Sequence, residues 1–173
     1  TQPYYEEMLE TIHSVIDEFL PEGNANSPAK IYEFGAGTGL VTEEILTHHA
    51  NIELTALEYD SKIYEQLSRR LQAPQLQCVC GDARSFIPEE PVDLSISVFA
   101  HDHIRNEDSK RLVRALRAGL KTGGIYIMGG ELLPFYGDDE ERISSLYRYH
   151  LFIINRALRH GHFDVAKLEI EAL

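Results

Sequence analysis

Three glycines at alternating positions, Gly35, Gly37 and Gly39, follow a largely apolar segment that carries one acid, Glu33. Glycine lacks a Cβ, so the backbone of such a segment can turn tightly and lie close to a ligand. The residues that follow, 40–46, have helical spacing, and the N-terminus of a helix carries a partial positive charge. Strand, glycine turn and helix in this order are typical of the opening unit of a nucleotide-binding α/β fold, although glycine turns also serve tight packing alone.

A second acid, Glu58, ends the next strand-like segment. A carboxylate there can accept hydrogen bonds from both vicinal hydroxyls of a ribose, and the alternative is a solvent-facing strand end. The dinucleotide pattern G-x-G-x-x-G would require glycine at position 40, which is Leu40, so the spacing disfavours an NAD-type oxidoreductase. The carboxylate of Glu33 would repel a diphosphate and suits a cationic or zwitterionic ligand.

Apolar periodicity predicts strands and helices in alternation along the chain. Strands are expected at 30–34, 51–58, 76–80, 92–99 and 125–129, and helices at 4–20, 39–48, 61–71, 107–120, 138–160 and 163–173. The helix at 61–71 has Asp60 or Ser61 as its cap, and residues 121–124 are expected to form a turn. This alternation predicts a parallel sheet with helices on both faces, built by right-handed crossovers.

Composition narrows the class of protein. The chain has 173 residues, 43% hydrophobic residues and a net charge of −12, and its basic residues lie at helical spacing, which disfavours a nucleic-acid partner. It contains no apolar run of the ~20 residues that a membrane helix requires, and its first residues do not form a signal peptide. Cys78 and Cys80 are expected on a buried strand, which fits a reducing, cytoplasmic compartment.

Four segments, in order, resemble the class I S-adenosylmethionine-dependent methyltransferases of the small-molecule type. They are the glycine turn at 33–39, the acid Glu58, the acidic turn at 81–83, and residues 120–127, in which Thr122 replaces the family's usual proline. The resemblance covers about residues 31–133 and implies a Rossmann-like parallel sheet of order 3-2-1-4-5 with helices on both faces. It also implies S-adenosylmethionine as the cofactor, with S-adenosylhomocysteine as its product form. The cofactor-binding residues that it implies are Glu33, Gly35, Ala36, Gly37, Gly39, Glu58, Tyr59, Asp82, Ala83, Phe99 and Ala100.

The resemblance also implies a role for each group of these residues. The glycine turn would approach the methionine portion and the ribose, with Glu33 near the methionine amino group and Glu58 on the ribose hydroxyls. On the adenine side, Tyr59 would lie against the ring, Asp82 would accept from its amino group and Ala83 would offer a backbone N–H. Residues 99–100, at the end of the fourth strand, would flank the sulfonium.

The exit of the fourth strand carries two histidines, His101 and His103, and lacks the Asn-Pro-Pro-Tyr pattern of amide-nitrogen methylation. Either histidine can act as a general base toward a hydroxyl or an amine. The alternatives are a metal held by His-x-His with Asp102, or a purely structural role, and we expect no metal here. His48, His49, His160 and His162 are expected to be surface residues at helix ends.

The family's sheet has seven strands and ends in an antiparallel hairpin, which the sequence after Gly130 does not show. We therefore expect a truncated chain, or strands supplied by a downstream segment, a partner chain or a dimer that covers the edge of the fifth strand. Residues 1–133 are predicted to form the cofactor-binding core, and 134–173 a helical segment of the same domain. The predicted function is methyl transfer to a small-molecule acceptor at oxygen, nitrogen or carbon. The alternative is a non-catalytic S-adenosylmethionine-binding module, or inactive methyltransferase-like domain, of a larger protein.

Overall fold

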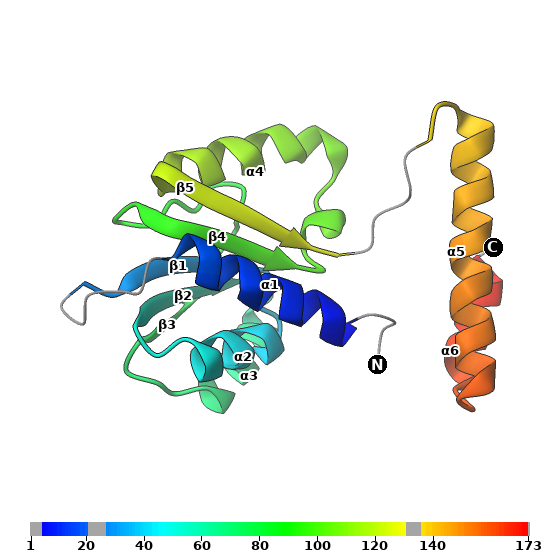
Figure 1. The fold of residues 1–173 in the computed structure, drawn as a ribbon, viewed down its shortest axis with the longest axis horizontal. Coiled ribbons are helices and arrows are strands. Elements are labelled where there is room, and N and C mark those ends of the chain that lie inside the picture. Colours follow the sequence, from blue (N-terminus) through cyan, green and yellow to red (C-terminus); the bar gives the residue numbers. More distant parts are fainter. Residues whose placement is uncertain (1–4, 21–26, 131–135, 173) are drawn as a thin grey trace. The chain divides into compact units, whose positions relative to one another are not determined.

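The structure is a computed structural model that describes residues 5–20, 27–130 and 136–172. The described elements form two compact units, one that contains the sheet and one that contains the last two helices (Figure 1). Tyr4, the predicted start of the first helix, and the predicted boundary at 133–134 lie outside the described residues. That both units belong to one domain therefore stays a prediction.

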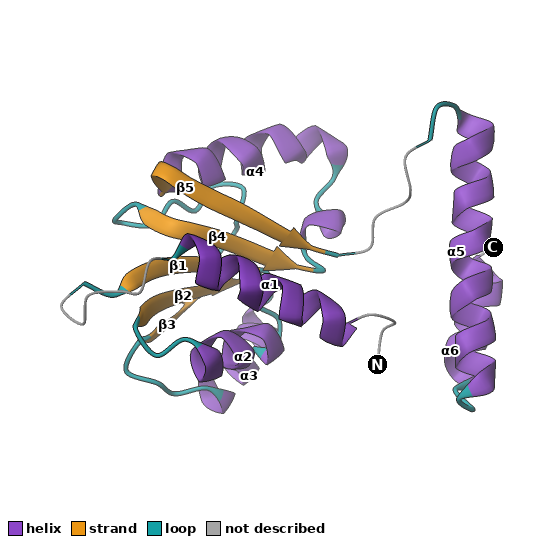
Figure 2. Ribbon diagram, in the orientation of Figure 1, coloured by secondary structure: helices purple, strands orange, loops and turns teal. Residues whose placement is uncertain are grey.

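The first unit alternates strands with helices, as the periodicity predicts (Figure 2). Its strands are β1 (Ala29–Phe34), β2 (Ile52–Glu58), β3 (Leu76–Cys80), β4 (Val92–Val98) and β5 (Leu120–Gly129). Its helices are α1 (Tyr5–Phe19), α2 (Leu40–His48), α3 (Ser61–Arg70), the short 3-10 helix η1 (His101–His103) and α4 (Asn106–Gly119).

The five strands form one sheet of order β3-β2-β1-β4-β5, and every neighbouring pair is parallel. The predicted strand order is confirmed. Because parallel strands all end at the same edge, the residues that follow β1, β2, β3 and β4 meet there. The glycine turn and the acids of the predicted site follow or end these strands.

Side chains that alternate along β1 divide the core between the two faces of the sheet. Ile31 packs in one cluster with buried residues of α1 and α2, such as Ile12 and Ile45. On the opposite face, Tyr32 and Phe34 pack with Leu112 of α4 and its neighbours. The third helix, α3, packs through Leu67 against Ala56 of β2. Ile52 and Leu54, on the same face of β2 as Ala56, belong to the cluster that contains α1 and α2. Helices thus cover both faces of the sheet, as predicted.

Two local predictions are wrong. Residues 121–124 lie within β5, because Leu120 pairs with Val92 and Ile125 pairs with Leu94, so the residues between them bulge from the strand. The prediction that Cys78 and Cys80 lie on a buried strand is also wrong, since Cys78 is half-buried and Cys80 is exposed. The reason is that β3 is an edge strand, which a helix covers only in part.

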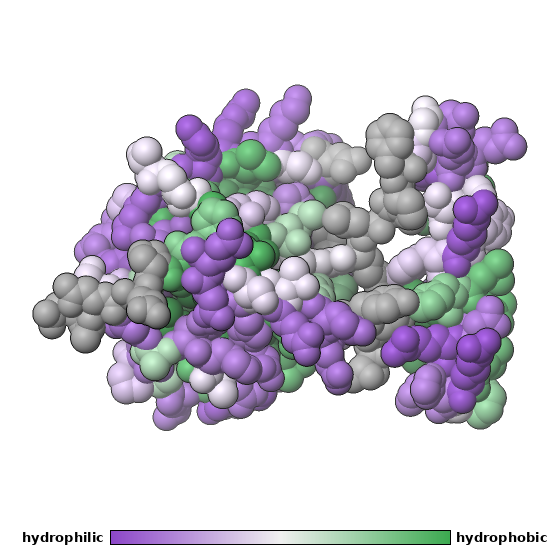
Figure 3. Space-filling model, viewed as in Figure 1, coloured by the Kyte–Doolittle hydropathy of each residue, from purple (hydrophilic) through white to green (hydrophobic). Residues whose placement is uncertain are grey.

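The second unit consists of α5 (Asp139–Arg159) and α6 (Phe163–Ala172), which pack through Ile154, Ala157 and Ala166. His150 Nδ1 and Glu169 Oε2 join the two helices at 2.7 Å. Several apolar side chains of this unit are exposed, and Figure 3 shows hydrophobic residues gathered on one side of it. The exposed apolar side chains of this unit include Leu151, Leu158, Phe163, Val165, Leu168 and Ile170.

No strand follows β5 among the described residues, so the hairpin of the larger family sheet is absent from this part of the chain. Within the same residues, no helix has both the length and the apolarity that a membrane span requires.

Candidate functional site

Gly35, Gly37 and Gly39 form the turn between β1 and α2, and their φ angles are 68°, 58° and 89°. L-residues with side chains rarely adopt this left-handed backbone, so the turn requires glycine. A Cβ added at Gly37 would meet no described heavy atom within 4 Å, whereas one added at Gly39 would lie 2.6 Å from Leu67 Cδ1. The backbone at Gly37 is therefore open to a ligand, and the missing side chain of Gly39 allows the turn to pack against α3.

Glu58, at the end of β2, is buried and holds two backbone segments together. The N–H of Gly37 donates to Oε2 at 2.9 Å, and the N–H of Asp60 donates to Oε1 at 2.8 Å. Asp60 caps α3 by accepting from the N–H groups of Lys62 and Ile63, which confirms one of the two predicted caps. A carboxylate has about four acceptor positions, so Glu58 keeps capacity for further donors.

Glu33 lies on β1 and is 2% exposed, on the same face of the sheet as Ile31. The hydroxyl of Thr42, in α2, donates to Glu33 Oε2 at 2.7 Å. Burial raises the pKa of Glu33 to about 7, and the hydrogen bond from Thr42 opposes this only in part. The carboxyl group is therefore partly protonated near neutral pH.

Asp82, in the turn after β3, is held by Arg84. Oδ1 accepts from the backbone N–H and Nε of Arg84 at 2.9 and 2.8 Å, and Oδ2 accepts from Nε and Nη2 at 3.0 and 2.6 Å. Arg84 Nη1 also donates to Asp108 of α4 at 2.8 Å. These hydrogen bonds lower the pKa of Asp82 and occupy about all of its acceptor positions.

The exit of β4 lies against the glycine turn. A Cβ added at Gly35 would fall 2.2 Å from the Cβ of Ala100, so the two segments are in close contact. Phe99 has a φ of 52°, a left-handed conformation that is costly for a residue with a side chain and is frequent at functional sites. Its N–H donates to Gly129 O at 2.9 Å, and its ring stacks on Tyr5 with centroids 6.2 Å apart.

The two predicted histidines differ in their surroundings. His101 Nδ1 lies 2.9 Å from the hydroxyl of Tyr126, which lies 2.8 Å from the hydroxyl of buried Ser97. Burial raises the pKa of Tyr126 to about 12, so this hydroxyl stays protonated at neutral pH. His103 ends η1 and is exposed. Among the described side chains, neither histidine belongs to a group of three metal-ligating residues.

A model of the methyltransferase domain matches residues 31–124, which is more than half of the chain. The chain belongs to the class I S-adenosylmethionine-dependent methyltransferases. The predicted family is therefore confirmed, and the glycine turn, Glu58 and the turn at Asp82 all lie within the matched range.

Two curated relatives each match about two thirds of this chain. An uncharacterized methyltransferase from Oceanobacillus iheyensis is 26% identical over 121 residues, 69% of this chain and 55% of the relative. The malonyl-[acyl-carrier protein] O-methyltransferase of Bacillus anthracis is 27% identical over 115 residues, 66% of this chain and 42% of the relative. The chain thus spans about half the length of the curated relatives that it matches.

Solved structures share the fold. An amino pentose methyltransferase from Micromonospora echinaspora, solved with S-adenosylmethionine bound, has a TM-score of 0.64 and 21% identity, with 80% of this chain and 55% of the other covered. A glycopeptide N-methyltransferase in complex with the same cofactor has a TM-score of 0.57 and 21% identity, with 70% and 52% covered. At this level of identity the likeness shows the fold alone.

The site of this methyltransferase domain fits the family's cofactor in two respects. The open side of Gly37 allows a ligand to lie against the backbone, and the carboxylate of Glu58 has acceptor capacity for hydroxyl groups. Asp82 fits its predicted adenine contact less well, because Arg84 occupies its oxygens. Tyr59, predicted to lie against the adenine, is 70% exposed, and Ala83 is half-buried.

Three residues of the site were not predicted from the sequence. Thr42, in the first turn of α2, donates to Glu33; Arg84 follows Asp82 by two residues; and Tyr126, on β5, lies close to His101 at the exit of the neighbouring strand β4. Of these three contacts, only the ion pair of Asp82 with Arg84 could have been predicted from the sequence, because an acid and a base two residues apart in one turn can pair locally. The other two pairings depend on how β1 meets α2 and how β5 meets β4.

Proposed function

We propose that this chain binds S-adenosylmethionine at the glycine turn and transfers its methyl group to a small-molecule acceptor. One observation carries the proposal. The left-handed turn at Gly37 and the buried acid Glu58 are hydrogen-bonded to each other at the carboxyl edge of a parallel sheet in a chain of the methyltransferase family. Open α/β sheets bind their ligands at this edge.

When bound, S-adenosylmethionine supplies a methyl group on a positively charged sulfur. The chain's own residues bind the cofactor and orient it. Glu58 is the acceptor for the ribose hydroxyls, and the open side of Gly37 is where the methionine portion and ribose approach the backbone. Ala100, which lies against Gly35, and its neighbour Phe99 are the residues assigned to the sulfonium. Transfer in line needs mainly such positioning, so no catalytic base is obligatory.

If the acceptor must lose a proton, His101 is the better placed of the two histidines. Tyr126 fixes its Nδ1, and this leaves Nε2 for another partner. His103 is exposed at the end of η1 and is assigned to contact with the acceptor. Both roles remain proposals for a reaction at a hydroxyl or an amine.

The relatives suggest the classes of acceptor to test. Their names state an amino pentose, a glycopeptide nitrogen and a malonyl group on an acyl carrier protein as what those proteins act on. These are amine and oxygen nucleophiles on small or flexible molecules. We propose an acceptor of this kind for this chain, and oxygen, nitrogen and carbon remain to be distinguished.

Calorimetry with S-adenosylhomocysteine, and with NAD as a negative control, tests the cofactor assignment. Glu58→Ala should weaken binding by about 1–3 kcal/mol, roughly 5- to 150-fold, because a charged acceptor is lost. Glu53→Ala, at the exposed opposite end of β2, is the matched control and should bind as the wild type does. Equal affinity of both variants in folded protein would refute the ribose assignment.

Glu58→Gln is the more conservative variant, since its amide oxygen can still accept from the N–H of Gly37, although its NH2 group cannot accept from the N–H of Asp60. Asp82→Ala should weaken binding less than Glu58→Ala does, because Arg84 already occupies the Asp82 carboxylate. A transfer assay with an amino sugar, a peptide amine and a malonyl thioester then tests catalysis. Binding of the cofactor without transfer to any acceptor would favour the non-catalytic binding module.

A further inference from the structure

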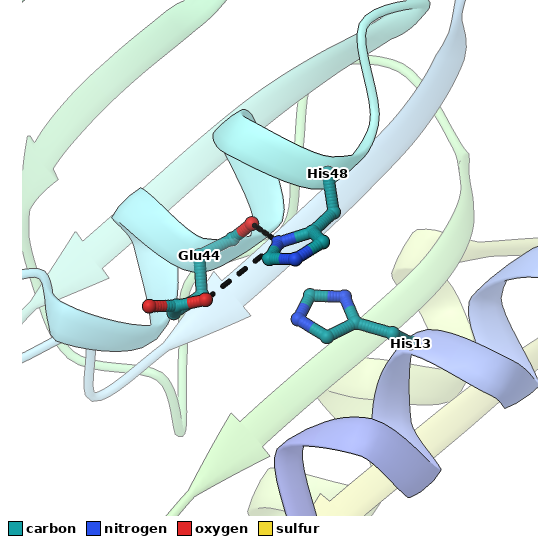
Figure 4. Close-up of side chains that lie close together, drawn as sticks. All are labelled: His13, Glu44 and His48. Carbon is teal, nitrogen blue, oxygen red and sulfur yellow. Dashed lines mark hydrogen bonds and ion pairs between the residues drawn. The ribbon is translucent and has the colours of Figure 1, made fainter. Parts of the chain in front are cut away.

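Outside the cofactor edge, three metal-ligating side chains converge where α1 crosses α2. They are His13 of α1 and Glu44 and His48 of α2 (Figure 4). One ligand atom from each lies within 4.8 Å of the others. Glu44 and His48 are four residues apart on one face of α2, and His48 lies at the opposite end of that helix from the glycine turn.

Further groups hold two of these imidazoles by one nitrogen each. His13 Nδ1 lies 3.0 Å from His49 Nε2, and His49 Nδ1 lies 3.4 Å from a carboxylate oxygen of Asp17. His48 Nδ1 lies 2.8 Å from the backbone carbonyl of Glu44, to which it can only donate. Metal-ligating histidines usually have the second nitrogen fixed in this way, by a carbonyl or by a chain that ends in a carboxylate. Nε2 of His13 and Nε2 of His48 are therefore the nitrogens left for a ligand. The carboxylate oxygen Oε2 of Glu44 lies 3.6 Å from the other nitrogen of His48, Nδ1, so the carboxylate turns toward Nε2 when it joins them on an ion.

His13 Nε2 is itself an unusual atom. It is buried and has no hydrogen-bond partner within the described part of the chain. A buried polar atom that lacks a partner is unfavourable and calls for an explanation.

The predicted surface role of the α2 histidines describes only His48. The side chain of His49 is 10% exposed, and its ring packs 5.2 Å from that of His13, between centroids. The ring of His48 lies 4.2 Å from that of His13. The imidazole rings of His13, His48 and His49 thus meet at one helix crossing. Protonated rings would repel one another there, whereas a divalent cation bound by neutral rings would stabilise the arrangement.

We propose that His13, Glu44 and His48 form a binding site for one divalent transition-metal ion of the zinc type. Two imidazole nitrogens and a carboxylate oxygen are a ligand set that zinc accepts, whereas magnesium and calcium prefer oxygen ligands alone. The ion connects α1 to α2 and thereby fixes α1, whose Tyr5 stacks on Phe99 beside the cofactor turn. The site is distinct from the proposed methyl-transfer site and does not depend on it.

Calorimetry with zinc chloride on the metal-free protein, with magnesium chloride in parallel, tests the proposal. The wild type should bind one zinc ion per chain and show no response to magnesium. Loss of an outer-shell partner of a metal lowers affinity by roughly 10- to 100-fold, so His48→Ala, Glu44→Gln and His13→Asn should each lower zinc affinity at least as much. Zinc should also raise the melting temperature of the wild type and not that of these variants.

His48 is exposed, so His48→Ala leaves the fold intact and keeps the test decisive if the His13 variant unfolds. The matched control is the double variant His160→Ala/His162→Ala, which removes two exposed histidines of the α5–α6 unit. It should bind zinc as the wild type does. Zinc binding that the control variant loses and the three site variants keep would overturn the proposal, as would a wild type that binds no zinc.

Discussion

Glu33 offers a direct test of how the site's electrostatics contribute to stability. Its carboxyl group is 2% exposed, and its hydrogen bond within the structure comes from the Thr42 hydroxyl. Replacing it by Gln keeps the size of the side chain and an oxygen that can accept from Thr42. The substitution therefore removes the titration of the buried group with little change in packing.

The magnitude follows from the pKa. The folded protein holds the Glu33 proton up to a pKa of about 7, whereas the unfolded chain releases it near 4.5, a difference worth about 3 kcal/mol. Between these pH values the folded state binds more protons than the unfolded state, so the contribution of Glu33 to stability falls as pH rises. Below pH 4.5 the wild type and Glu33→Gln should be equally stable. Above pH 7 the variant should be more stable, by about 3 kcal/mol.

Urea unfolding of both proteins at several pH values between 5 and 8, without cofactor, measures this difference. The other carboxylates titrate in both proteins, so their contribution to the pH dependence of the free energy of unfolding cancels in the difference. Glu53→Gln, an exposed acid on β2, is the control and should show no growing difference. A constant difference between wild type and Glu33→Gln across this range would refute the argument, and so would a variant less stable than wild type at pH 8.

Two other substitutions test the turn and the histidine network. Gly35→Ala combines a left-handed residue with a Cβ 2.2 Å from that of Ala100, so it should cost at least ~1–3 kcal/mol in a melting experiment. Gly37→Ala, where the space is open, should cost less stability and mainly weaken cofactor binding; equal stability losses would contradict the packing argument. Tyr126→Phe leaves buried Ser97 without its partner and should cost roughly 1–3 kcal/mol. If it also lowers turnover while S-adenosylhomocysteine affinity is unchanged, the histidine network acts on the acceptor, whereas unchanged turnover would restrict it to stability.

Most of the fold could be predicted because its strands and helices have clear periodicity. The parallel sheet with two covered faces follows from the alternation of elements and right-handed crossovers, the turn follows from its three glycines, and the strand order came with the family resemblance. The start of β5 could not be predicted, because glycines at 123–124 signal a turn locally, while pairing of Leu120 with Val92 extends the strand around them. The burial of Cys80 was predicted wrongly from the small apolar side chains of its strand, although the predicted strand order already places β3 at the edge of the sheet.

The candidate site was predictable where one residue type at one strand end is enough. Glu58 and Gly37 follow from their places in the sequence, and the structure brings them into hydrogen-bonding contact. Pairings between distant residues left no signal, such as Tyr126 with His101 or His13 with the residues of α2. The partner expected at the edge of β5 stays a prediction, because β5 pairs only with β4 among the described strands.

The buried state of Glu33 also changes one step of the sequence argument. Its charge was taken to repel a diphosphate, but a carboxyl with a pKa of about 7 is largely uncharged just below neutral pH. The case against a dinucleotide therefore depends on Leu40 and on the family, rather than on this charge. A cationic group next to Glu33 would lower its pKa and favour the ionised form, whereas an anionic group would keep it protonated. The hydrogen bond from Thr42 is compatible with both states, because the Glu33 oxygen that accepts it is present in the ionised and in the protonated carboxyl group.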